Sequence, residues 1–158
     1  MPSKPVDKLL KEKKIREVVN PRLIQAPPDI SVQRAIEFMQ ENQSAYIVVA
    51  ENKKAIGILT ETDVIRKIME TDVDWKRPIR EFMTPNPIVL SPNDTVGRAI
   101  DLMAEHRFYH IPLVDEKGDL TGILSVRTLI RFLAEFYPAE IYNLPPNPNQ
   151  IMQTPEGG

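Results

Sequence analysis

The chain contains the stretch Gly57-Ile58-Leu59-Thr60-Glu61-Thr62-Asp63, and 65 positions later the related stretch Gly122-Ile123-Leu124-Ser125-Val126-Arg127-Thr128. The similarity continues outward, because Ile15-Arg16-Glu17 near the N-terminus recurs as Ile79-Arg80-Glu81. Repetition at a nearly constant spacing predicts a repeated structural unit, and two copies indicate a pseudo-twofold pair, since a solenoid needs at least three. Residues shared by the copies describe the scaffold, so we look for function where the copies differ.

In each copy, short apolar runs typical of strands and apolar residues at helical spacing follow one another in the same order. This order predicts an α+β fold with a strand, a helix, two strands and a second helix per copy. The first helices carry apolar residues spaced i, i+3, i+4 and i+7, namely Val32, Ala35, Ile36 and Met39, then Val96, Ala99, Ile100 and Met103. Ser31 and Thr95 precede these helices as N-caps. The second helices are predicted to bury Val64, Ile65, Ile68 and Met69, then Leu129, Ile130 and Leu133.

These patterns divide the chain into an N-terminal extension (1–14), a first unit (15–76), a second unit (77–136) and a proline-rich tail (137–158). The extension is predicted to form a short amphipathic helix that carries Ile15 into the core. The repeated prolines of the tail prevent the preceding helix from continuing into it. We expect the end of the tail to be mobile.

The composition of the chain argues against several classes of function. A net charge of −2 over 158 residues gives no electrostatic case for nucleic acid binding. No apolar run approaches the length of a membrane span. The absence of cysteine excludes disulfides and thiol chemistry and fits a reducing compartment, so we expect a cytoplasmic protein.

Signals of catalysis are weak throughout the sequence. The chain has no cysteine nucleophile, no Gly-x-Ser-x-Gly elbow and no Walker phosphate loop. His106 and His110 lie four residues apart, which suits two metal ligands on a continuous helix, but a strand is predicted to begin near His110. We therefore expect neither an enzyme nor a metal site, and a hydrolase that uses His110 is the catalytic alternative.

The first of the two quoted stretches has the chemistry of a phosphate- and sugar-binding site. A strand that runs through Gly57 into a helix beginning near Thr60 presents free backbone N–H groups and the positive end of a helix. Asp63 can accept both hydroxyls of a ribose, and the hydroxyls of Thr60 and Thr62 can reach sugar or phosphate. The same Thr-x-x-Asp spacing is close to a capping box, so a purely structural role for Asp63 is the alternative interpretation.

This order of elements, repeated in tandem, resembles the cystathionine β-synthase (CBS) domain pair, or Bateman module, over residues 15–136. The resemblance rests on the glycine motif at residues 57–63 and on the segment from Thr95 to Asp115, which contains Tyr109-His110-Ile111-Pro112-Leu113-Val114. It implies a sensor that binds an adenosine-containing ligand between the two units, with the motif's aspartate as the ribose anchor and no required cofactor. It also implies a disc-like homodimer and, because no effector domain accompanies the module, regulation of a separate protein.

By the family pattern, the motif of one copy faces the strands of the other, which gives two predicted sites. The stronger site comprises Gly57, Ile58, Thr60, Thr62, Asp63, Ile88, Val89, Tyr109, His110, Ile111 and Pro112. The weaker site comprises Gln25, Ala45, Tyr46, Ile47, Gly122, Ser125, Arg127 and Thr128. Thr128 stands where the first copy has its aspartate, so the second site offers no anionic acceptor for a diol, although Arg127 could serve a ligand phosphate.

The sequence thus predicts a regulatory module for AMP, ADP or ATP, with one dominant site per chain. S-adenosylmethionine or a dinucleotide is an alternative ligand, because the positions of the arginines do not fix the number of phosphates. A ligand-free dimerisation module, in which Asp63 only caps its helix, is the alternative function.

Overall fold

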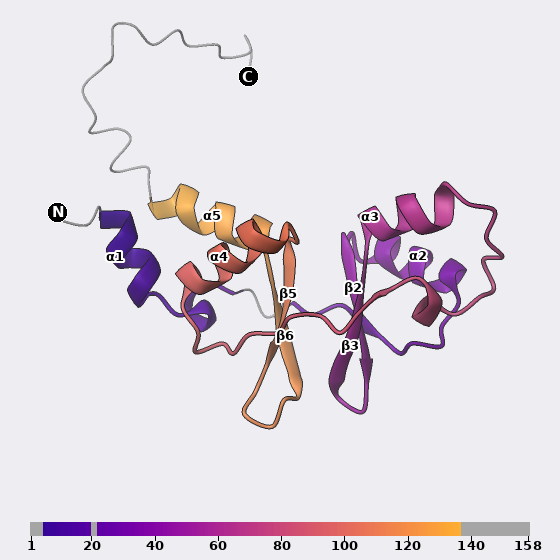
Figure 1. Ribbon diagram of the computed structural model, residues 1–158, viewed down its shortest axis with the longest axis horizontal. Coiled ribbons are helices and arrows are strands. Elements are labelled where there is room, and N and C mark those ends of the chain that lie inside the picture. The colour runs from indigo at the N-terminus through magenta and orange to yellow at the C-terminus, as the bar shows by residue number, and fades with distance from the viewer. Residues whose placement is uncertain (1–4, 20–21, 137–158) are drawn as a thin grey trace, which may run out of the picture.

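The computed structural model describes residues 5–19 and 22–136. The expected mobile tail at residues 137–158 lies outside the described residues. Figure 1 shows two halves side by side, each built from a strand hairpin with helices packed beside it. In both halves the helices lie toward one side of the molecule and the hairpin turns toward the other. No helix in the described ranges is long and apolar enough to cross a membrane.

The first half follows the element order predicted for the first copy. It contains β1 (Gln25–Ala26), α2 (Val32–Glu41), β2 (Tyr46–Glu51), β3 (Lys54–Thr60) and a helix that begins as α3 (Glu61–Asp63) and continues as a π-helical segment (Val64–Met69). The sheet has the order β1-β2-β3-β4, in which β1 is parallel to β2 and the short β4 (Thr84–Pro85) is antiparallel to β3.

The second half repeats this order with a reduced first strand. Its elements are α4 (Val96–His106), β5 (His110–Val114), β6 (Leu120–Ser125) and α5 (Val126–Phe136). Where the first half has β1, the second half has a single parallel bridge between Leu90 and Leu113. Pro87 and Pro92 flank this segment, and a proline cannot donate a hydrogen bond to a neighbouring strand.

The starts of the two long helices confirm the predicted caps. The Ser31 hydroxyl accepts a hydrogen bond from the Arg34 backbone N–H at 3.1 Å, and the Thr95 hydroxyl accepts one from Arg98 at 3.2 Å. Helix α4 ends at His106, and the following residue, Arg107, has a φ of 56° in the left-handed region. His106 and His110 are therefore not on one helix, as expected from the strand predicted at His110.

Each half has its own hydrophobic core, and each core includes a turn from the other sequence copy. Ile15, in the turn Ile15–Glu17, is fully buried in the core of the second half, and its N–H donates to the Asp94 carbonyl at 2.9 Å. Ile79, in the turn Ile79–Glu81, is fully buried in the core of the first half, and its N–H donates to the Ile30 carbonyl at 2.9 Å. The helix α1 (Pro5–Glu12) leads into the first of these turns. The leading turns are thus exchanged between the halves.

The predicted buried stripes of the second helices are wrong at three positions. Ile68 and Leu129 are buried, but Ile65, Met69 and Ile130 are 51%, 68% and 59% exposed. A helix that covers a small sheet turns only one narrow face toward it, so the neighbouring apolar positions stay outside. The side chains of Ile65, Met69 and Ile130 therefore lie on the exposed surface of these helices.

Candidate functional site

The centre of the predicted stronger site is a buried carboxylate. Asp63 lies where β3 passes into its helix, and at 8% exposure it is the one buried polar or charged residue in the described part of the chain. A buried charge is costly unless other groups compensate it. The surroundings of Asp63 therefore define what this position can bind.

Four donors surround the Asp63 carboxylate. Its Oδ2 atom accepts from the Thr60 backbone N–H at 3.0 Å and from the Thr60 hydroxyl at 3.1 Å. Its Oδ1 atom accepts from the Thr84 hydroxyl at 3.4 Å and lies 3.0 Å from the Lys67 ammonium. The Thr60 hydroxyl in turn accepts from the Asp63 N–H at 3.4 Å, which completes a capping box. The geometry is thus also that expected if Asp63 only caps its helix.

Two of these donors were not among the predicted site residues. Lys67 follows Asp63 by four positions, a spacing that brings side chains together on a helix, so the sequence contained a local signal for this pair. Thr84 reaches Asp63 from β4, because Thr84 pairs with Ile58 of β3. That contact joins residues 21 positions apart, so no local sequence pattern predicts it.

The second motif builds the same turn without a charge. The Ser125 hydroxyl accepts from the Thr128 N–H at 3.2 Å and lies 3.2 Å from the Thr128 hydroxyl. Phe132 stands four positions after Thr128, where the first motif has Lys67. Arg127, the predicted phosphate ligand of the weaker site, is exposed.

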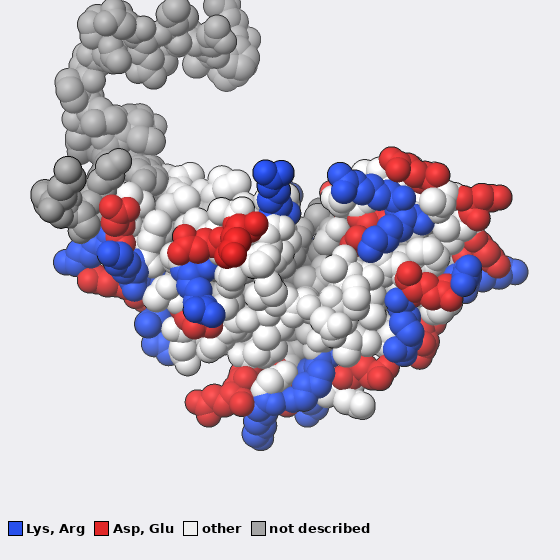
Figure 2. Space-filling model, in the orientation of Figure 1, with Lys and Arg blue, Asp and Glu red and all other residues white. Residues whose placement is uncertain are grey.

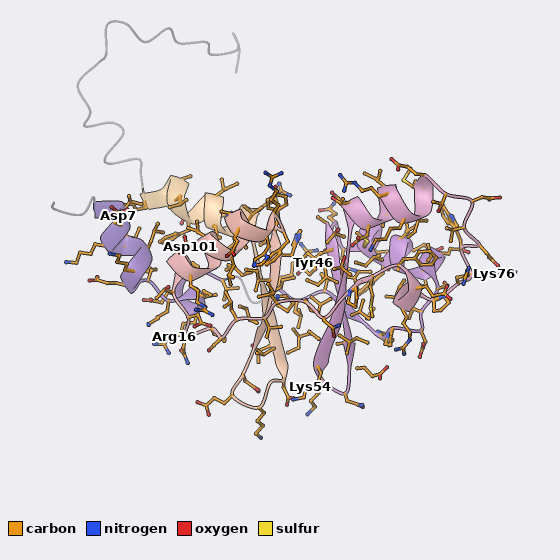
Figure 3. The ribbon with its side chains drawn as sticks, in the orientation of Figure 1. Asp7, Arg16, Tyr46, Lys54, Lys76 and Asp101 are labelled. Carbon is orange, nitrogen blue, oxygen red and sulfur yellow. The ribbon has the colours of Figure 1, made fainter. Side chains whose placement is uncertain are left out.

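An aromatic pair joins the two halves. Tyr46 is the strand partner of Thr60, and His110 is the strand partner of Ser125, so the two residues occupy equivalent positions in the two hairpins. Their ring centroids lie 5.1 Å apart, and Figure 3 shows Tyr46 between the halves. Burial lowers the pKa of His110 to about 4 and raises the pKa of Tyr46. Both rings are therefore neutral at pH 7.

The tips of the two hairpins form a second contact between the halves. The Lys54 ammonium lies 2.7 Å from the Asp119 carboxylate and 2.6 Å from the Lys117 carbonyl. The Leu120 N–H donates to the Lys53 carbonyl at 2.7 Å. Figure 3 shows Lys54 at the end of the molecule away from the helices. The halves are thus joined at both ends of their hairpins.

The surface between the halves is hollowed on the side of the helices. Figure 2 shows a notch there, with Lys or Arg side chains on both sides of its rim. Elsewhere on this face acidic and basic side chains are interspersed. Positive charge beside a notch favours an anionic ligand.

The predicted site residues occupy three kinds of position. Some of the predicted site residues are buried within strands, namely Gly57, Ile58, Ile47, Gly122, Ile111 and Pro112. Ala45 is half-buried just before β2. Thr62 and Gln25 are exposed, as are the apolar side chains of Ile88 and Val89. The described contacts bring together Thr60 with Asp63, Ser125 with Thr128, and Tyr46 with His110.

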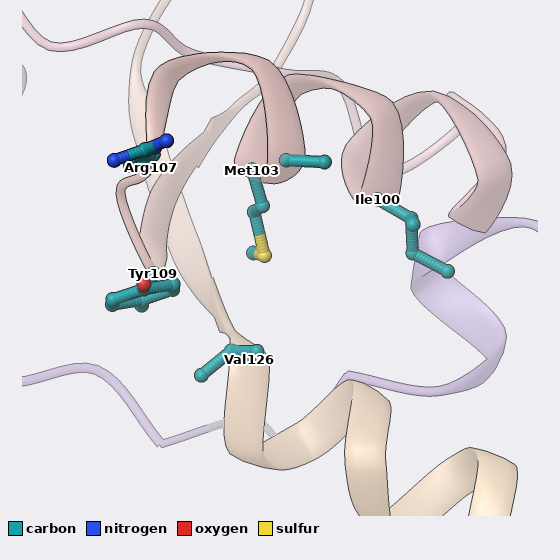
Figure 4. A pocket seen from close by; sticks show the side chains of 6 residues that line it. Ile100, Met103, Arg107, Tyr109 and Val126 are labelled. Atoms are coloured by element: carbon teal, nitrogen blue, oxygen red, sulfur yellow. The ribbon is translucent and has the colours of Figure 1, made fainter.

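Tyr109 belongs to a different hollow. It lines a groove of about 450 Å³ in the second half together with Ile100, Met103, Ala104, Arg107 and Val126, and Figure 4 shows its ring facing this space. An equivalent groove of about 520 Å³ in the first half is lined partly by Ile65 and Met69. Neither groove is lined by Asp63. Within residues 5–19 and 22–136, no three His, Cys, Asp or Glu side chains come together as a metal site would require.

Comparison with known proteins identifies the class to which this two-unit fold belongs. The model of the CBS domain family matches residues 15–70 and 79–135. These two matches cover most of the sequence, and the chain belongs to the CBS domain family.

Two curated relatives illustrate how such pairs occur. An uncharacterised 17.7 kDa protein of Acidianus ambivalens is 26% identical over 125 residues, which are 78% of this chain and 75% of that protein. The inosine-5′-monophosphate dehydrogenase of Aquifex aeolicus is 28% identical over 116 residues, which are 72% of this chain but only 23% of the enzyme. The chain thus spans less than a quarter of that enzyme.

Solved structures have the same fold. The crystal structure of a CBS domain protein, NE2398, matches with a TM-score of 0.72 and 28% identity over 77% of this chain and 98% of that one. The structure of a CBS domain protein of Pyrobaculum aerophilum complexed with AMP matches with a TM-score of 0.69 and 22% identity over 77% of this chain and 96% of that one.

Proposed function

We propose that the chain is a regulatory module that binds an adenine nucleotide, AMP, ADP or ATP, in the notch between its halves, with one dominant site at Asp63. The burial of the Asp63 carboxylate carries the proposal. The second motif caps its helix with Ser125 and Thr128 alone, so the turn itself needs no buried charge. The carboxylate therefore has a role beyond capping, and acceptance of a ribose diol suits it.

Other groups support a nucleotide in this place. Thr60 and the exposed Thr62 stand at the start of the helix that follows β3, and their hydroxyls suit sugar or phosphate oxygens. Ile88 and Val89 are exposed apolar residues of the second copy, and a purine requires apolar surfaces for its two faces. The structure of a protein of the same fold is that of its complex with AMP, which makes AMP the first ligand to test.

The proposed mechanism is a shift between two arrangements of the halves. A ligand that contacts both halves favours the arrangement in which both contacts form, by as much as its affinities for the two arrangements differ. We propose that a separate effector protein in the cytoplasm binds one of the two arrangements in preference to the other. We assign no catalytic step to the module.

Calorimetry tests the proposal directly. Wild-type protein is titrated with AMP, ADP, ATP and S-adenosylmethionine, and Asp63→Asn is titrated in parallel. We expect saturable binding near one ligand per chain, weakened at least about tenfold in Asp63→Asn because the amide replaces an acceptor by a donor. Asp101→Asn, an exposed position on α4, is the matched control and should bind like the wild type.

A ligand-free dimerisation module is the second candidate, and the complete capping box around Asp63 favours it. It predicts no heat with any of the four ligands and a modest loss of stability in Asp63→Asn. The same titration, combined with thermal unfolding of both variants, therefore separates the two candidates.

We also propose that the module forms a homodimer through its helical side. The grooves of about 450 and 520 Å³ lie there, and Ile65, Met69 and Ile130 expose apolar side chains that a second copy would cover. Light scattering after gel filtration should give the mass of a dimer, and Met69→Glu should shift it toward the monomer. A monomeric wild type at micromolar concentration would contradict this.

A further inference from the structure

The Asp63 carboxylate has no acceptor capacity left for a ligand. Two carboxylate oxygens offer about four lone-pair sites. Two donors from Thr60 occupy Oδ2, while Thr84 and Lys67 occupy Oδ1. A ribose diol can therefore bind Asp63 only if at least one of these donors leaves.

Lys67 is the donor that can leave most easily. The two Thr60 donors sit in the same turn as Asp63, and Thr84 is held by the pairing of β4 with β3. The Lys67 side chain is 42% exposed, and its ammonium sits on a flexible four-carbon stem that can turn into solvent.

The second contact of Lys67 leads away from the motif. Its ammonium donates to the Phe82 carbonyl at 3.0 Å. Phe82 ends the turn Ile79–Glu81, and Met83 and β4 follow it along the connection to the second half. Met83 also lies directly over Gly57, where an added Cβ would collide with its sulfur. Lys67 therefore links the Asp63 carboxylate to the segment that joins the two halves.

The two sequence copies support a paired role for these charges. Thr128 replaces Asp63 and Phe132 replaces Lys67 in the second copy, where Phe132 packs against the core. The acid and the cation are thus both present in one copy and both missing from the other.

We infer that Lys67 is a releasable tether: a diol that binds Asp63 displaces the Lys67 ammonium and so frees the backbone at Phe82 from the ligand-binding motif. This inference rests on the proposed function, because it requires a diol-bearing ligand at Asp63. It adds the route by which occupancy of the site reaches the connection between the halves.

Adenosine is the probe, because it carries the diol without phosphates that would attract the lysine. It is titrated into the wild type, Lys67→Met and Arg66→Met, and 2′,3′-dideoxyadenosine serves as the diol-free ligand. Arg66→Met is the matched control, since it removes one positive charge from an exposed neighbouring position. Amide hydrogen exchange of Met83 and Asn86 reports on the connection, because their N–H groups donate to Ile79 and Ile56.

We expect Lys67→Met to bind adenosine about threefold to tenfold more tightly than the wild type, since no ion pair must be broken. Arg66→Met should bind it like the wild type, and 2′,3′-dideoxyadenosine should gain nothing. Adenosine should accelerate exchange at Met83 and Asn86 in the wild type, whereas exchange in Lys67→Met should be fast with or without adenosine. If Lys67→Met does not fold, Lys67→Gln, which keeps a donor without the charge, takes its place.

Equal or weaker adenosine binding in the folded Lys67 variant would overturn the inference and leave the proposed function intact. Unchanged exchange at Met83 and Asn86 on saturation of the wild type would overturn it as well. Absence of saturable binding in the wild type, with adenosine and with all four ligands of the first titration, would overturn the proposed function and the inference with it.

Discussion

At the end of β3 a threonine and a buried carboxylate form the start of the helix, whereas at the end of β6 a serine and a threonine do so. The hairpins that carry the two motifs have equivalent registers, with Tyr46 opposite Thr60 and His110 opposite Ser125. Since the strand register at the two motifs is the same and their side chains differ, the comparison separates what the scaffold requires from what a ligand would require. The scaffold requires a hydroxyl cap, and the charge at Asp63 is additional.

Exchanging the residues that distinguish the two motifs, Asp63 and Thr128, should have the largest effect on ligand binding. Asp63→Thr gives the first motif the residue of the second, and we expect AMP affinity to fall about tenfold to a hundredfold because a charged acceptor is lost. The helix start should persist, since Ser125 and Thr128 support the same turn. Calorimetry measures the affinity, and circular dichroism checks the fold.

The reciprocal change, Thr128→Asp, sharpens the same test. We expect a second, weaker binding event in the AMP titration, because the second motif then offers a carboxylate for a diol. Unchanged affinity in Asp63→Thr, together with unchanged stoichiometry in Thr128→Asp, would contradict the assignment of the difference to ligand binding.

The equivalent positions Tyr46 and His110 should differ in their response to acid. Burial lowers the pKa of folded His110 to about 4 from an ordinary 6.5. Between these values the unfolded chain binds a proton that the folded chain does not, so stability falls as pH drops from 6.5 to about 4. By pH 5 the loss should be on the order of 2 kcal/mol. Urea unfolding at pH 7.5, 6 and 5 measures it.

His110→Phe should reduce this slope while keeping a ring against Tyr46. His106→Gln, an exposed histidine at the end of α4, is the control and should keep the wild-type slope. An identical pH dependence in wild type and His110→Phe would show that carboxylates alone cause the acid sensitivity.

The two motif glycines should respond differently to the same substitution. An added Cβ at Gly57 would collide with the Met83 sulfur, whereas one at Gly122 would lie 3.7 Å from Leu113 Cδ1, an ordinary van der Waals contact. Gly57→Ala should lower the free energy of unfolding by about 1–2 kcal/mol, and Gly122→Ala should change it by less than about 1 kcal/mol. Denaturant unfolding compares them, and Met83→Ala should relieve the Gly57→Ala variant.

The contact at the hairpin tips should have the smallest effect. Lys54→Met removes the ion pair with Asp119, both partners of which are partly exposed, and we expect a loss of about 0.5 kcal/mol that shrinks at high salt. Lys53→Met is the control, because Lys53 contributes its backbone carbonyl to this contact. Equal losses in the two variants would mean that the Lys54 side chain adds nothing to the joint.

Local patterns sufficed for much of this fold. The repeat, the element order and the caps at Ser31 and Thr95 follow from short-range spacing, and the structure has them. The exposure of Ile65, Met69 and Ile130 was not predicted, because helical periodicity marks apolar faces without saying what covers them. The exchange of the leading turns was also missed, since contacts such as Ile15 with Asp94 depend on the path of the whole chain.

The candidate site shows the same division. The contact between Thr60 and Asp63 could be predicted because their spacing is local, and the contact of Lys67 with Asp63 could have been predicted from its i+4 relation. Thr84 could not, because only the pairing of β4 with β3 brings it to the carboxylate. The meeting of Tyr46 with His110 likewise requires the two hairpins to be placed side by side.

The exchanged turns have a consequence for how the chain is made. When a ribosome has released the first 70 residues, the first half still lacks Ile79, which is fully buried in its core. The second half, when it emerges, depends on Ile15, which was synthesised long before. The first half can therefore complete its core only after Ile79 and Phe82 have emerged, and we expect a nascent chain arrested near residue 75 to be sensitive to proteases.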